Sequence, residues 1–334
     1  MEDGLKFMIP KLLALTGLRP FASKTLAAVN AANYCNSGTR GAHPSRIKRK
    51  LFSCALAGAL VFSAALAHAE QSPADQLGFQ VGIAERSFQN FTLFEAMDKT
   101  AALGLKYFSL SAKVKLDDGT APLTVDLTDH QIAAIKKHAA EKGLTIVNAY
   151  VSLPANEERC RREFELAKRM GIDVLVGEPP TNALDLVEKL CKEYNVKVAI
   201  HDHPKGHSAY WQPENVLAAI KGRTPLMGAC ADTGHWVRSG LDPVECLKKL
   251  HGHVICLHFK DLNVNNPKGH DVPWGTGVGN CKGMMEELQR QGFHGAFLAE
   301  YEYHYDSSTP ELAQCAKFFN DTCAQLVAAK PAAP

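Results

Sequence analysis

From residue 79 onward, short β-branched or apolar runs alternate eight times with longer amphipathic stretches. Short apolar runs are typical of buried strands, whereas apolar residues at three- and four-residue spacing indicate helices. The predicted strands are 81–84, 107–111, 145–151, 174–177, 196–200, 227–231, 254–258 and 296–299. The predicted helices are 93–103, 129–142, 157–170, 184–194, 213–220, 243–250, 282–290 and 310–327.

This alternation limits the folds that the chain can adopt. Many predicted helices end in glycine, such as Gly143 and Gly171, which is the residue that most readily forms a left-handed helix cap. Strand spacings of about 25 to 40 residues are typical of β-α-β units in a closed barrel of about 250 residues. The alternative architecture is an open doubly wound sheet, which usually has a Gly-rich phosphate-binding turn after its first strand. No such turn follows the first predicted strand here. The sequence therefore predicts an α/β protein with a single (β/α)8 TIM barrel.

The first 69 residues lack this alternation. Residues 46–50 are basic, residues 51–66 form an apolar stretch too short for a bilayer span, and residues 67–69 have the A-x-A form of a cleavage site. We expect a signal peptide cleaved after Ala69, a barrel domain of residues 70–334, a periplasmic or secreted address and no stable membrane anchor. The role of residues 1–45 stays open.

Charge content limits the classes of binding partner, and cysteine content bears on possible disulfides. Nine of the 37 Lys and Arg and two of the 35 Asp and Glu lie in the first 69 residues, which leaves 28 basic and 33 acidic residues. A mildly acidic body disfavours nucleic acid as a partner. Eight cysteines remain, and this even number in an exported chain allows one or two disulfides, although their positions within helices and strands suit buried thiols.

Strands five to eight end in imidazole or carboxylate groups, namely His201, Asp232, His258 and Glu300. Active sites of barrels lie where the strands end, and side chains two and four positions back along a strand point the same way. Those positions are apolar or small in seven of eight cases: Ala199, Cys230, Cys256, Leu298, Gly228, Val254 and Ala296, with Lys197 the exception. We therefore expect the four polar groups to face the barrel interior together.

Two imidazoles and two carboxylates suit a divalent transition metal ion, with Mn²⁺, Zn²⁺, Co²⁺ or Fe²⁺ all compatible. Each residue alone is better explained as a hydrogen-bonded group at a loop edge. Their matched register favours a shared metal site. The same parity places His203, Gly234, Lys260 and Glu302 one step closer to the mouth.

These residues also carry a family resemblance. The runs that end in His235, Asp261 and Glu302, after a strand that ends near His-Asp-His-Pro204, resemble the xylose-isomerase-like barrel superfamily, which includes sugar phosphate isomerases/epimerases. The resemblance covers residues 78–327. It implies that Asp232, His258 and Glu300 are metal ligands and that His235 contacts substrate. The chain departs from the family at His201, where a glutamate is usual.

The resemblance also implies a mechanism. In ketose epimerases two metal-bound glutamates exchange a proton beside a sugar carbonyl, and His201 puts that symmetry in doubt. Glu300 remains as a metal-bound base, with His203, Glu178 or Glu302 as the free acid/base. Lys260 is a candidate for neutralising oxyanion charge, and an ion pair between Lys260 and a rim acid such as Asp261 is an equally good explanation.

Further substrate contacts are expected at the rim of the barrel. Glu85 ends the first strand, and Glu302 lies beyond the last. Trp236 and Trp274 would offer aromatic faces to a sugar, although tryptophan is as often plain packing.

These observations predict a metal-dependent sugar isomerase/epimerase that acts on a non-phosphorylated sugar or keto-sugar through an enediolate. The exported address and the lack of a phosphate-binding turn favour a substrate without phosphate. A lyase or hydrolase of a keto-sugar glycoside and a non-catalytic periplasmic sugar-binding barrel stay open, and an AP-endonuclease is disfavoured. The sugar, the metal, the reaction and the oligomeric state are not decided by the sequence.

Overall fold

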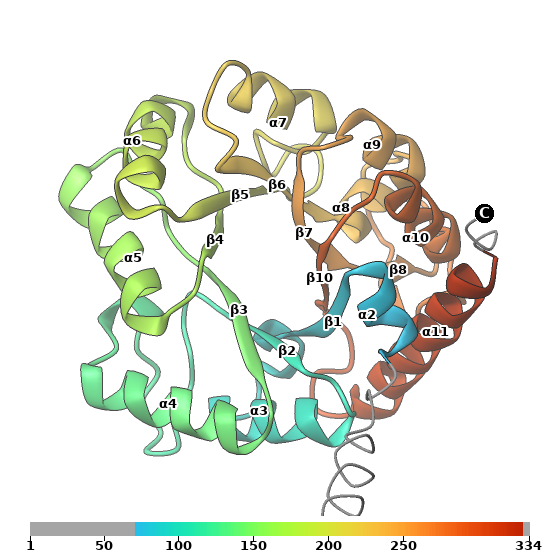
Figure 1. The fold of residues 1–334 in the computed structure, drawn as a ribbon, viewed down its shortest axis with the longest axis horizontal. Helices are drawn as coiled ribbons and strands as arrows, with labels where there is room; N and C mark the ends of the chain where they lie inside the picture. The colour runs from blue at the N-terminus through green and yellow to red at the C-terminus, as the bar shows by residue number, and fades with distance from the viewer. Residues whose placement is uncertain (1–70, 330–334) are drawn as a thin grey trace, which may run out of the picture. The chain divides into compact units, whose positions relative to one another are not determined.

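A computed structural model describes residues 71–329. Eight parallel strands close into a barrel in the order β1-β10-β7-β6-β5-β4-β3-β2 (Figure 1). The barrel strands are β1 (Phe79–Ala84), β2 (Tyr107–Leu110), β3 (Thr145–Tyr150), β4 (Val174–Gly177), β5 (Lys197–His201), β6 (Met227–Asp232), β7 (Val254–Phe259) and β10 (Gly295–Ala299). The predicted single (β/α)8 barrel is confirmed. The expected signal peptide lies outside the described residues.

Helices surround the barrel (Figure 1). The eight predicted helices are α3 (Leu93–Ala102), α4 (Asp129–Glu141), α5 (Glu157–Met170), α6 (Leu184–Tyr194), α7 (Pro213–Ile220), α9 (Pro243–Lys249), α10 (Cys281–Arg290) and α11 (Thr309–Ala328). The pattern did not predict the short elements α2 (Pro73–Leu77), α8 (Thr233–Arg238), the 3₁₀ turns η1 (Glu85–Phe88), η2 (Thr124–Asp126) and η3 (Thr181–Ala183), or the hairpin β8 (Asp261–Leu262) and β9 (Asp271–Val272).

Local chemistry sets the helix ends. Thr92 and Glu95 form a capping box at the start of α3, in which each side chain accepts from the other residue's backbone N–H. Gly171 follows α5 at φ 76°, a left-handed conformation that costs glycine little. Capping residues in the sequence therefore set where α3 begins and where α5 ends.

The apolar side chains form an outer and an inner layer. The outer layer packs the helices against the strands, and the inner layer fills the barrel with Ala84, Val176, Ala199, Cys230, Cys256, Ala296 and Leu298. The predicted inward columns are thus confirmed at most positions. Val254 is the exception, because a register shift between β6 and β7 turns Ile255 toward the inner layer and packs Val254 on the outer one.

The one or two disulfides that the sequence allows are absent from the described residues. All eight cysteines there are free and buried. Cys230 and Cys256 pair in register on β6 and β7 and fill the barrel interior. In this chain the thiols act as small buried hydrophobic groups.

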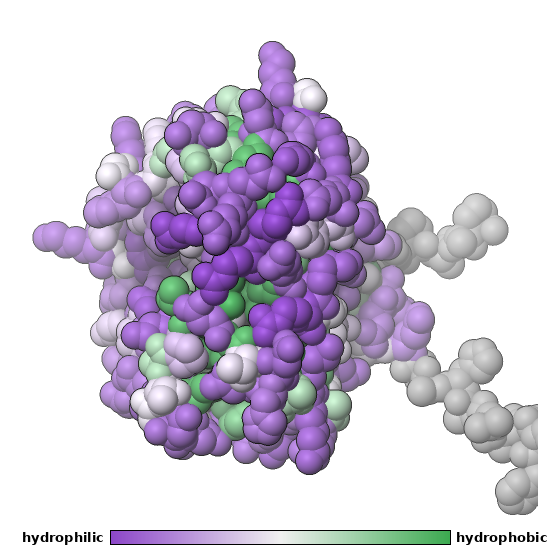
Figure 2. Space-filling model, turned by 90° about the vertical axis from the view of Figure 1, so that its left-hand side faces the viewer, coloured by the Kyte–Doolittle hydropathy of each residue, from purple (hydrophilic) through white to green (hydrophobic). Residues whose placement is uncertain are grey.

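Hydrophilic residues cover most of the face shown in Figure 2, and hydrophobic ones appear in small patches between them. Among the described residues the large exposed hydrophobic side chains are Leu123, Val264 and Val278. No helix within residues 71–329 is long and apolar enough to cross a membrane.

Candidate metal centre

The ends of β5, β6, β7 and β10 bring His201, Asp232, His258 and Glu300 together. His201 Nε2 lies 3.1 Å from His258 Nδ1 and 3.7 Å from Asp232 Oδ2. His258 Nδ1 lies 3.2 Å from Glu300 Oε2 and 4.0 Å from Asp232 Oδ2. The four side chains are nearly buried, with at most 12% of the side-chain surface exposed. Four donors predicted from separate strands therefore share one small volume.

The two separations of 3.1 and 3.2 Å from His258 Nδ1 fit a common cation, and the separations of 3.7 and 4.0 Å to Asp232 Oδ2 are longer. Bonds of about 2.0 to 2.2 Å from a divalent ion to nitrogen and oxygen ligands place neighbouring ligand atoms roughly 3 to 3.5 Å apart. Two imidazole nitrogens 3.1 Å apart must either share a proton or bind the same ion. His235 offers a further nitrogen, 3.5 Å from Asp232 Oδ2. The donor atoms of His201, Asp232, His235 and Glu300 all lie within 4.8 Å of one another.

The run Asp232-Thr-Gly-His235 has a local structural reason at each position. Asp232 caps α8, because its Oδ1 accepts from the His235 N–H at 2.9 Å, which leaves Oδ2 toward the other ligands. Thr233 Oγ1 accepts from the Lys260 N–H and donates to the Lys260 carbonyl, so it joins the ends of β6 and β7. A Cβ at Gly234 would lie 2.8 Å from Lys260 Cδ, so only glycine lets the lysine pass.

Glu178 orients two histidines. Its Oε1 contacts His201 Nδ1 at 3.1 Å and also His203 Nδ1, while its Oε2 accepts from Ser208 Oγ. Burial alone would raise the pKa of Glu178, but these hydrogen bonds outweigh it and lower the pKa to about 2. A carboxylate that holds one ring nitrogen fixes the other for a metal ion. Both carboxylate oxygens of Glu178 are therefore engaged, and Glu178 is not among the residues that line the neighbouring cavity.

Lys260 lies among carboxylates with its side chain fully buried. Its Nζ is 3.0 Å from Asp232 Oδ2, 2.7 Å from Glu300 Oε2 and 2.8 Å from Glu302 Oε2. Burial alone would lower the pKa of Lys260, but these carboxylates outweigh burial and raise the pKa well above its usual value. Lys260 is not among the residues that line the neighbouring cavity.

The alternative interpretation of Lys260, an ion pair with a rim acid, is confirmed with Glu302 as the acid. Asp261, the example named for it, does not pair with Lys260. Asp261 instead accepts from the backbone N–H groups of Gly275, Gly277 and Gly279. A Cβ at Gly277 would lie 2.4 Å from Asp261 Oδ1. Asp261 thereby holds the loop that follows β9.

The net charge of the cluster is compatible with a bound divalent ion. Four carboxylates lie in or beside the cluster, with two permanent cations. Lys260 pairs with Asp232, Glu300 and Glu302, and Arg86 also pairs with Glu302. The fourth carboxylate, Glu178, contacts only histidines. With both histidines neutral, as metal binding requires, two negative charges remain. A divalent cation would balance them. His201 otherwise takes up a proton, since its carboxylate neighbours outweigh burial and raise its pKa to about 10.

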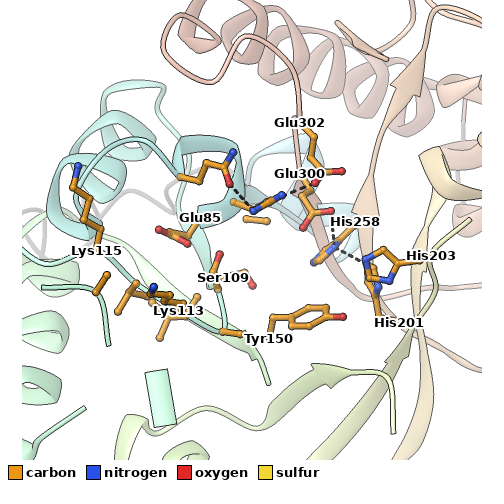
Figure 3. A pocket seen from close by; sticks show the side chains of 18 of the residues that line it. Glu85, Ser109, Lys113, Lys115, Tyr150, His201, His203, His258, Glu300 and Glu302 are labelled. Atoms are coloured by element: carbon orange, nitrogen blue, oxygen red, sulfur yellow. Dashed lines mark hydrogen bonds and ion pairs between the residues drawn. The ribbon is translucent and has the colours of Figure 1, made fainter. Parts of the chain in front are cut away.

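A cavity of about 650 Å³ opens beside the cluster (Figure 3). The expected residues Glu85, His203, His235, Glu300 and Glu302 line it, with His201 and His258. The His203 and His235 rings stack with centroids 4.9 Å apart. Burial raises the pKa of Glu85 and, as the main cause, lowers that of His235.

Trp236 and Trp274 do not line this cavity. Both are buried in the outer core, at 1% and 3% exposure. Trp274 donates from Nε1 to the Phe259 carbonyl and packs against Phe259 and Phe319. The prediction that they face a sugar is therefore wrong. Both indoles fill the space between the strands and the helices.

The cavity also has lining residues that sequence reasoning missed. Tyr150 ends β3 and meets the His201 ring edge-on, with centroids 5.3 Å apart. Arg86 pairs with Glu302 at 3.3 Å, and Ser109 lies near the end of β2. The sequence signal for Ser109 and Tyr150 is a polar group at the end of the second and of the third strand.

Comparisons with known proteins agree with this fold. No curated protein sequence matches the chain. An uncharacterized protein from Parabacteroides distasonis is 34% identical, with a TM-score of 0.59 over 73% of this chain and 99% of that one. A D-tagatose 3-epimerase-like protein is 18% identical, with a TM-score of 0.59 over 75% and 98%. A barrel protein from Mycobacterium smegmatis, in complex with magnesium, is 14% identical, with a TM-score of 0.62 over 77% and 99%.

The last two proteins, at 18% and 14% identity, are similar to this chain in fold alone. The family assignment rests on a family model, described as a xylose isomerase-like TIM barrel, that matches residues 97–321. The matched region contains the strand ends that carry His201, Asp232, His258 and Glu300. The chain belongs to the xylose isomerase-like TIM barrel family.

Proposed function

We propose that this protein is an exported, metal-dependent sugar isomerase or epimerase that acts on a non-phosphorylated sugar or keto-sugar. The observation that carries the proposal is the convergence of His201, Asp232, His258 and Glu300 beside a cavity of about 650 Å³. A magnesium ion in one protein of the same fold is consistent with a divalent ion here. When bound, such an ion would polarise a carbonyl or hydroxyl oxygen of the sugar.

The residues of the chain supply the proton chemistry. Glu300 lines the cavity, and its neighbours His258 and Lys260 outweigh burial and hold its pKa well below the usual value. It is therefore ionised and able to accept a proton from the carbon beside a carbonyl. Delivery of a proton to the opposite face of the same carbon would give epimerisation, and delivery to the neighbouring carbon would give isomerisation.

One observation favours a second candidate, elimination from a keto-sugar glycoside. The cavity holds one metal-centre glutamate and an imidazole, His203, whose Nδ1 is engaged by Glu178. Nε2 is thus the nitrogen left to protonate a departing oxygen after Glu300 has removed a proton from the adjacent carbon. This asymmetric pair suits elimination better than the exchange of a proton between two glutamates does.

Incubation of the metal-loaded mature protein with keto-sugars in deuterated water tests the proposal. Deuterium that enters the carbon beside the carbonyl is expected for isomerisation or epimerisation. Release of the glycosyl substituent, with loss of the hydrogen from that carbon, marks elimination. Turnover with complete retention of carbon-bound hydrogen would contradict enolisation. A Glu300→Gln variant that exchanges as fast as the unmodified protein would also contradict the role given to Glu300.

A further inference from the structure

The cavity extends beyond the metal centre. Its lining runs from His201 past Tyr150 to loop 111–121, and Figure 3 shows Lys113 and Lys115 at the end away from the imidazoles. Ligand sites range over roughly 300 to 1,000 Å³, so a cavity of about 650 Å³ holds more than a small sugar. Space remains next to the lysines when a sugar ring lies at the metal centre.

The segment that carries these lysines is held in place. Val114 donates from its N–H to the Pro122 carbonyl at 3.2 Å, so the chain turns back along itself. Val114 and Leu116 are buried, at 0% and 7% exposure. Side chains alternate along an extended chain, so Lys113 and Lys115 project from the other side. Their place on the cavity wall follows from packing.

The two ammonium groups are not neutralised by the protein. Among the described residues neither forms an ion pair, and Lys115 Nζ has only the Asn90 carbonyl as a partner, at 3.3 Å. The lining acids Glu300 and Glu302 are already paired with Lys260. Glu85, the remaining lining acid, is 3% exposed, and its burial favours the neutral form. This end of the cavity is therefore positive.

We propose that Lys113 and Lys115 form a subsite for the acidic group of the substrate, and that the substrate is an acidic saccharide with a uronate carboxylate. The reacting sugar would lie at the metal centre and the carboxylate at the lysines. This inference rests on the proposed function, because it assigns the remaining part of the same cavity. Exposed lysines that are merely solvated would show no preference between charged and neutral sugars.

Calorimetric titration with two matched disaccharides tests the subsite. The probes are cellobiose and cellobiouronic acid, in which glucuronate replaces the non-reducing glucose. The proteins are the unmodified enzyme, Lys113→Gln/Lys115→Gln, and the control Lys106→Gln/Lys137→Gln, which removes the same charge from exposed positions outside the cavity lining. Melting temperatures of all three check that the variants fold.

The unmodified and control proteins should bind cellobiouronic acid about tenfold more tightly than cellobiose. The Lys113→Gln/Lys115→Gln variant should lose this preference and keep its affinity for cellobiose. Higher salt should reduce the preference, since the Debye length is about 10 Å at 0.1 M.

Equal affinities in the unmodified protein, a preference that survives the double substitution, or no binding of either sugar would overturn the subsite. The proposed function is decided separately, by metal content and deuterium uptake, so the two fail independently.

Discussion

The ammonium nitrogen of Lys260 lies 2.7 Å from Oε2 of Glu300, and the lysine side chain has no solvent exposure. The same nitrogen contacts Asp232 and Glu302. A permanent cation thus lies against two of the four candidate metal ligands. It reduces the repulsion between their carboxylates when no divalent ion is bound.

Replacement of Lys260 should therefore be costly, and most costly without metal. Lys260→Met should lower the free energy of unfolding of the metal-free protein by about 3 to 5 kcal/mol, because it leaves buried carboxylates unpaired. Mn²⁺ should recover part of the loss by supplying positive charge. Urea unfolding with chelator and with Mn²⁺ measures both values.

Lys137→Met is the matched control, since it removes an exposed ion pair with Glu141 that is worth less than about 1 kcal/mol. An identical loss for Lys260→Met with and without metal would argue against shared charge compensation.

Glu178 should matter through His201. Glu178→Gln weakens the contact that fixes the ring, so the affinity for Mn²⁺ should fall by roughly 10- to 100-fold, the usual effect of losing such a partner. Calorimetric titration of the metal-free protein measures the change. Glu193→Gln, which alters an exposed ion pair with Arg161, should leave the affinity unchanged. Unaltered affinity in Glu178→Gln would refute the positioning role.

The free cysteines make a prediction about redox state. All eight described cysteines should be alkylated in denaturant without any reductant, and none should react quickly in the folded protein, because each is buried. Intact-protein mass spectrometry counts the modified thiols. Groups that become reactive only after reduction would show disulfides that the structure does not contain.

Glu163 should give a pH-dependent stability that is unrelated to the metal centre. It is 7% exposed, and burial raises its pKa to about 7. Because the folded pKa exceeds the unfolded one, the stabilising contribution is full below about pH 4.5 and is lost as the pH rises through 7.

Glu163→Gln removes this dependence. The difference in free energy of unfolding between the variant and the unmodified protein should shift in favour of the variant by about 1 to 2 kcal/mol from pH 5 to pH 8. This value includes a reduction for solvent screening. Chemical unfolding at both pH values provides the numbers. A pH-independent difference would show that Glu163 ionises normally.

The sequence was most informative where periodicity and position coincide. Strand alternation located His201, Asp232, His258 and Glu300 because a parallel barrel brings all strand ends to one face. The same rule failed at Val254, where a register shift between β6 and β7 reverses the facing side. Nothing in the apolar run from Val254 to Leu257 signals that shift.

Contacts between side chains from distant strands could not be predicted. Glu178 and Lys260 were each assigned to the mouth of the barrel, yet one holds His201 and His203 and the other is enclosed by three carboxylates. Trp236 and Trp274 were misplaced because an indole at a rim position packs inward as readily as it lines a pocket. Such outcomes depend on loop paths and packing, which a single sequence does not encode in a readable pattern.

The central claim is that His201, Asp232, His258 and Glu300 bind one divalent cation. Titration of the chelator-treated mature protein with Mn²⁺, with free ion counted by electron paramagnetic resonance, tests it most directly. The account predicts one tightly bound ion per chain, an affinity at least about 100-fold weaker in Asp232→Asn, and little change in Lys106→Gln. The absence of saturable binding, or equal affinity in Asp232→Asn, would contradict it.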